Sequence, residues 1–182
     1  MYFIDSAGWL TPAAKHPSLN FNARPPSAEV SLLVIHNISL PAGQFGGGYI
    51  HDLFANCLDC DAHESFDDLR ELNVSAHLLI DRSGAVSQFV SFADRAWHAG
   101  VSQFDGRENC NDFSIGIELE GCDEIAYTQA QYRVLIAISQ TLRRTYPAIT
   151  VDRVVGHNDI APGRKTDPGA AFDWTYFKNA LV

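Results

Sequence analysis

The sequence has no long apolar run and no cluster of basic residues, and both absences exclude classes of function. No apolar stretch approaches the roughly 20 residues that a helix needs to cross a bilayer. Its 13 basic residues are scattered among 22 acidic ones, which gives a formal net charge of −9. A nucleic acid or an anionic membrane would require a positive patch, so neither is an expected partner.

The N-terminal segment Met1 to Trp9 also lacks a basic region leading into an apolar core, the pattern of a secretory signal. We therefore expect a cytoplasmic protein. With 182 residues, 46% of them apolar, the chain can bury a core of its own. Residues 1–30 contain four prolines and little periodicity, so we expect an irregular arm packed on a single domain spanning residues 1–182. We expect a monomer.

Cysteine is scarce, with four residues at positions 57, 60, 110 and 122. Cys57 and Cys60 have the C-x-x-C spacing of a redox pair or of half a zinc site. A structural zinc site would need a second close pair, and Cys110 and Cys122 are far apart in sequence. No βαβ pattern surrounds Cys57, as a thioredoxin-like centre would require. We interpret the cysteines as reduced thiols and keep a redox function as the weakest alternative.

Two segments are typical of strands. Ser31 to His36 is a nearly continuous apolar run, as expected of a central strand covered on both faces. From Phe113 to Glu120 apolar and other residues alternate, with Phe113, Ile115, Ile117 and Leu119 on one face. The opposite face, Ser114, Gly116, Glu118 and Glu120, is either solvated or the floor of a polar site.

The remaining patterns predict a hairpin, helices and a further strand. Val74 to Asp81 and Ala85 to Phe92 flank a turn that contains Gly84. Thr128 and Gln131 have capping-box spacing ahead of an apolar stripe, and Asp173 can cap a closing helix. A short helix over Tyr49 to Asn56 and a strand over Thr150 to Val155 complete the set. Together these elements predict an α/β domain with a mixed central sheet flanked by helices.

A candidate site lies in the segment from Val155 to Gly169, which is too rich in Gly and Pro to be a helix or a central strand. It contains His157, Lys165 and Asp167, and it is either a solvated connection or a scaffold that presents ligands. Upstream, His36 closes the predicted strand from Ser31. Two histidines and an aspartate are a common ligand set for a zinc ion that keeps a position open for water.

Further side chains complete the chemistry of such a site. Glu118, on the polar face of a predicted strand, could act as a base, and Lys165 is equally well a surface lysine or a partner of an oxyanion. Among the other histidines, His77 is more easily a buried residue bonded to backbone than a ligand. His98 lies beside Trp97 and is expected at the rim. The remaining histidines are given no role.

Four segments in order resemble a known family: Val34 to Ser39, Arg95 to Gly100, Ser114 to Gly121 and Gly156 to Gly169. They closely resemble the AmpD-type zinc amidases of bacterial cell-wall recycling, which are related to phage amidase lysozymes and peptidoglycan recognition proteins. The resemblance covers nearly the whole chain, from Gly8 to Trp174.

This resemblance implies that His36, His157 and Asp167 bind zinc, that Glu118 is the general base and that Lys165 stabilises the transition state. The substrate would be an anhydro-muropeptide, cut between the lactyl group of 1,6-anhydro-N-acetylmuramic acid and L-alanine. Asn37 and Trp97 match motif positions that line the substrate groove.

Two positions depart from the family pattern, because Asn73 and Asn109 stand where arginine is expected. Arg70 and Arg107 are near in sequence and are candidates to replace them, so the preference for the stem peptide stays open. Two other functions also stay open: a muropeptide-binding module without activity, and an amidase that acts on polymeric cell wall.

Overall fold

Six strands form the central sheet of the computed structural model, which describes residues 1–182. Their order across the sheet is β12 (Val154–Gly156), β5 (Leu32–Ile38), β11 (Ser114–Glu120), β6 (Leu78–Ile80), β7 (Val86–Gln88) and β3 (Ala14–Lys15). The hairpin of β6 and β7 is antiparallel, as its Gly-containing turn predicted, whereas the other neighbouring pairs are parallel. The predicted mixed sheet is thus confirmed.

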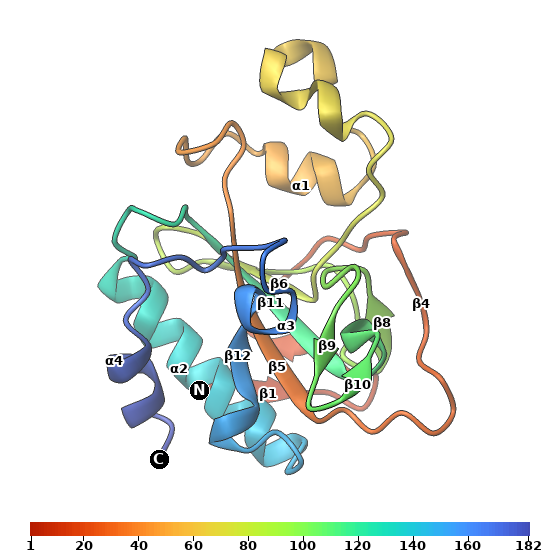
Figure 1. The fold of residues 1–182 in the computed structure, drawn as a ribbon, viewed down its shortest axis with the longest axis vertical. Coiled ribbons are helices and arrows are strands. Elements are labelled where there is room, and N and C mark those ends of the chain that lie inside the picture. Colours follow the sequence, from red (N-terminus) through yellow and green to blue (C-terminus); the bar gives the residue numbers. More distant parts are fainter.

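Helix α2 (Gln129–Thr145) lies along one face of this sheet, with α4 (Trp174–Asn179) beside it (Figure 1). The apolar face of β11 and the apolar stripe of α2 share one core, in which Ile117 and Leu135 are fully buried. Both bonds of the predicted capping box join Thr128 and Gln131, and Asp173 caps α4. α1 (Tyr49–Phe54) lies at the opposite end of the molecule (Figure 1).

Short elements connect and cover the sheet. Two strands of the N-terminal region, β1 (Phe3–Ile4) and β2 (Leu10–Thr11), pair with each other. A third, β4 (Phe21–Ala23), pairs with the more distant β8 (Asp94–Ala96). A small hairpin joins β9 (Gln103–Phe104) to β10 (Arg107–Glu108). Short 3-10 helices span Cys60–Ala62, Glu64–Leu69, Cys110–Asp112 and Val151–Arg153. No helix combines the length and apolar character that a membrane crossing demands.

Two predictions about the C-terminal third were wrong in part. Val151–Arg153 is a 3-10 turn and the strand begins only at Val154, because Arg153 bonds back to Thr150 and its guanidinium holds the Ser31 carbonyl. His157 does not lie in a loop but begins the single-turn helix α3 (His157–Ile160). The Asp159 carboxylate accepts the Gly156 N–H at 2.7 Å and holds that turn, so the Gly- and Pro-rich composition takes effect only after Ile160.

Candidate metal centre and amidase site

The carboxyl ends of three parallel strands bring the predicted site residues to one edge of the sheet. Glu118 in β11 is the register partner of His36 in β5. Partners in neighbouring strands point to the same face, here the face opposite α2. Gly156 of β12 pairs with Ile35, so His157 follows at the same edge. Such an edge is where open α/β sheets place their ligands.

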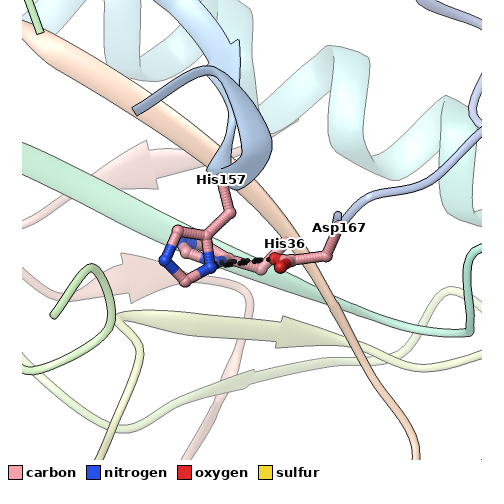
Figure 2. A group of neighbouring side chains, drawn as sticks. All are labelled: His36, His157 and Asp167. Atoms are coloured by element: carbon pink, nitrogen blue, oxygen red, sulfur yellow. Dashed lines mark hydrogen bonds and ion pairs between the residues drawn. The ribbon is translucent and has the colours of Figure 1, made fainter. Parts of the chain in front are cut away.

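Three donor atoms converge there. Nδ1 of His36 and Nδ1 of His157 are 3.0 Å apart, and each lies 3.1 Å from Oδ2 of Asp167. The three side chains point toward one another from β5, α3 and the loop after α3 (Figure 2). Both histidines are almost fully buried. The structure therefore assembles the three residues that were predicted as ligands.

The Nε2 atoms of the two rings, which point away from the cluster, also lie within hydrogen-bonding distance of polar atoms. His157 Nε2 lies 3.1 Å from the Ala99 carbonyl oxygen. A carbonyl oxygen can only accept, so Nε2 carries the proton and Nδ1 offers a lone pair. His36 Nε2 lies 2.9 Å from His98 Nδ1. Two imidazole nitrogens and a carboxylate oxygen this close repel one another unless a proton or a cation lies between them, so the donor set fits a divalent metal ion.

The electrostatic surroundings favour the ligating form of two of these groups. Burial lowers the pKa of His36 to about 4, with the His157 and Lys165 charges acting in the same direction. Burial alone would raise the pKa of Asp167, but hydrogen bonds with His157 and His36 outweigh it and hold that pKa below its ordinary value. At neutral pH the site thus presents a neutral His36 imidazole and a carboxylate.

The carboxylates on the polar face of β11 differ in their bonding. Glu120 accepts hydrogen bonds from the backbone N–H of Gly46 at 2.6 Å and of Arg82 at 3.1 Å. It therefore holds the two loops that contain these residues. Glu118 is 9% exposed, and its Oε2 has no hydrogen-bond partner. Burial, and next the Asp167 charge, raise the pKa of Glu118 well above its ordinary value, while Lys165 opposes this shift. Glu118 is therefore the carboxyl that is free to exchange a proton.

The three predicted ligands and the two predicted catalytic residues border one cavity of about 550 Å³. Its polar end holds His36, Glu118, His157, Lys165 and Asp167. Apolar side chains form much of the remaining wall: Ile38, Leu40, Leu53, Phe54, Leu69, Leu72 and Val74. A cleft with one apolar wall and a few convergent polar groups is the usual form of a small-molecule site.

The expected substrate contacts line the same cavity. Asn37 is held by a 2.8 Å bond to Asp123, and the Trp97 indole N–H donates to Asn22 at 2.7 Å. Asn73 also lines this cavity, whereas Asn109 borders a neighbouring one.

Neither arginine that was a candidate to replace the expected ones lines the cavity. Arg70 is paired with Asp61 and Asp67, and Arg107 stacks on the Phe113 ring.

Two other histidines lie next to the site, and one of them, His98, also lines its cavity. The prediction for His77 is confirmed: it is fully buried, accepts the Gly116 N–H and contacts the Asp94 carbonyl. The prediction for His98 was wrong, because it is buried against His36 instead of lying at the rim. A signal was present in Gly116, where a Cβ would lie 2.5 Å from the His98 ring.

Known proteins are similar to this chain in both sequence and fold. Residues 26–170 match the family model described as N-acetylmuramoyl-L-alanine amidase. The chain is 57% identical to a 1,6-anhydro-N-acetylmuramyl-L-alanine amidase, AmpD, of Salmonella typhimurium, over 98% of this chain and 95% of that protein.

Solved structures agree with the sequence comparison. The crystal structure of a selenomethionine derivative of AmpD has a TM-score of 0.95 at 52% identity and covers 99% of both chains. AMPDH3 from Pseudomonas aeruginosa, in complex with anhydromuramic pentapeptide, has a TM-score of 0.63 at 29% identity and covers all of this chain and 67% of that one. From its sequence, its fold and the residues gathered at the edge of its sheet, this chain belongs to the N-acetylmuramoyl-L-alanine amidase family.

Proposed function

We propose that this amidase uses a zinc ion to hydrolyse the amide between the lactyl group of 1,6-anhydro-N-acetylmuramic acid and L-alanine in muropeptides. His36, His157 and Asp167 would hold the ion. The observation that carries the proposal is that three metal-ligand atoms within 3.1 Å of one another share a cavity with the unpaired carboxyl of Glu118.

The bound ion would supply Lewis-acid chemistry, polarising the amide carbonyl and making water more acidic. Glu118 takes the proton of the attacking water and passes it to the leaving amine, a role suited to a carboxyl whose pKa burial raises. Lys165 places its ammonium near the developing oxyanion. Apolar side chains line much of the cavity wall beside these groups.

The choice of substrate rests on the relatives. The 57%-identical AmpD is named for its action on 1,6-anhydro-N-acetylmuramyl-L-alanine, and AMPDH3 was solved with anhydromuramic pentapeptide. Asn37 and Trp97 would contact this substrate from the cavity wall. We further propose that residues 1–182 act as one monomeric domain in the cytoplasm.

Mass spectrometry of products tests this function. The protein is incubated with anhydro-muropeptide and, separately, with intact cell wall, each with and without a chelator. We expect release of the free stem peptide from the anhydro-muropeptide, loss of this activity with the chelator, and recovery on adding zinc. Equal or faster release from intact wall would favour an amidase of polymeric wall. Binding of the muropeptide without cleavage in the presence of zinc would favour a binding module.

A further inference from the structure

A hydrogen-bonded chain runs from His36 into the protein interior. His36 Nε2 lies 2.9 Å from His98 Nδ1, and His98 Nε2 lies 3.2 Å from the Ser114 hydroxyl. Ser114 is fully buried and His98 is 8% exposed. If His36 offers Nδ1 to a metal ion, its Nε2 carries the proton and donates to His98 Nδ1. His98 then donates its own Nε2–H to the Ser114 hydroxyl oxygen.

Further contacts hold this hydrogen-bonded chain of side chains in position. The side-chain oxygen of Asn111 accepts the N–H groups of His98 and Ala99, at 3.1 and 2.8 Å. The His98 ring lies over Gly116, on the β11 face that also carries Ser114 and Glu118. A Cβ at position 116 would lie 2.5 Å from the ring and push it away.

The residue after His98 also contacts the second predicted ligand, His157. The Ala99 carbonyl accepts from His157 Nε2, so consecutive residues bond to the outer nitrogens of both imidazoles. Outer partners of this kind fix the tautomer and the orientation of metal-ligating histidines.

We infer that His98 is a positioning residue: by accepting the His36 Nε2–H, it sets the tautomer and ring orientation in which His36 Nδ1 binds the metal ion. This inference rests on the proposed function, because it requires His36 to be a ligand. It assigns His98 no contact with the reacting atoms.

Zinc affinity and the cobalt(II) spectrum of variants test the inference. His98→Phe keeps a ring but removes the acceptor, and Gly116→Ala displaces the ring with every polar group retained. His98→Asn is the matched control, since its side-chain oxygen can take the place of Nδ1. Zinc affinity is measured on full-length proteins by competition with a chelating dye. Visible absorption of the cobalt(II) form reports the ligand arrangement, and thermal unfolding with chelator reports the fold.

We expect His98→Phe and Gly116→Ala to bind zinc about 10- to 100-fold more weakly and to show altered cobalt bands. His98→Asn should retain most of the affinity and the wild-type bands. A folded His98→Phe with wild-type affinity and bands would overturn the inference, as would equal losses in the Phe and Asn variants. If His98→Phe fails to fold, Gly116→Ala decides by the same criteria. A wild-type protein without zinc affinity would overturn the metal centre and this inference together, whereas unaffected variants of a zinc-binding wild type overturn the inference alone.

Discussion

At the scale of single residues, what separates Glu118 from Glu120 is hydrogen bonding. Both carboxylates lie on one face of β11, but Glu120 is bonded through both oxygens to loop N–H groups. Glu118 keeps an unpaired oxygen beside the donor cluster. Only Glu118 is available to move a proton without first breaking loop contacts.

The first prediction concerns this proton transfer. Glu118→Gln keeps the shape of the side chain but cannot act as a base, so we expect kcat to fall by about 100- to 10,000-fold, the usual contribution of general acid-base catalysis. Zinc content, measured by elemental analysis, should stay at the wild-type level. Near-normal turnover with full zinc would remove Glu118 from the base role.

A second prediction concerns metal retention. Asp167→Ala removes the only carboxylate among the three converging donors, so the ion loses both a ligand and a neutralising charge. We expect the variant to lose most of its zinc on dialysis under conditions where the wild type keeps it. Asp123→Asn serves as a control, because Asp123 bonds to Asn37 outside the donor cluster. Equal zinc contents in Asp167→Ala and the wild type would contradict ligation by Asp167.

At the scale of elements, helix α2 holds the core face of the sheet and is tied to the hairpin at its start. The Thr128 hydroxyl accepts the Gln131 N–H at 3.1 Å and donates to the Arg82 carbonyl at 2.9 Å. Thr128→Ala removes both bonds, and we expect it to lower the free energy of unfolding by about 0.5–2 kcal/mol. Urea denaturation measures this change.

Thr145→Ala at the other end of α2 is the matched control. Thr145 is exposed and bonds only to the carbonyl one turn back, so the expected change lies within about 0.5 kcal/mol. Equal losses in the two variants would mean that the cap has no particular role.

The elements themselves were largely predictable from the sequence. The alternation in β11, the apolar run of β5 and the capping residues of α2 act between neighbours in the chain. The turn at Val151–Arg153 was missed, because β-branched residues favour a strand locally whereas a long-range bond from Arg153 to Ser31 holds the turn.

At the scale of the whole molecule, buried neutral histidines make the fold sensitive to acid. Burial lowers the pKa of His77 to about 3, with the Arg24 charge acting in the same direction. Below its ordinary pKa of 6.5, the unfolded chain takes up a proton at His77 that the folded protein excludes until about pH 3. The stability contributed by neutral His77 is therefore complete above pH 6.5 and is lost as the pH falls toward 3.

We expect the free energy of unfolding to decrease from pH 7 to pH 5, by up to about 1.4 kcal/mol per pH unit for one such histidine. Denaturant titrations in a chelating buffer measure this slope without a contribution from metal release. The raised pKa of Glu118 changes the free energy of unfolding with pH in the opposite direction. Comparing the slope of the wild type with that of His77→Gln therefore isolates the contribution of His77. That variant should show a shallower slope, and an equally steep one would contradict the argument.

The sequence alone determined the mixed sheet, the placement of His36 in a central strand and the candidate donors, because periodicity, caps and turns depend on nearby residues. The strand does not end at His36, as predicted, but continues to Ile38. Only the tertiary structure decided that His36 meets Asp167, 131 positions away, that His98 lies behind His36, and that Glu118 is the unpaired carboxyl. These contacts depend on strand register and on which polar groups find partners in the packed interior, and no local pattern encodes them.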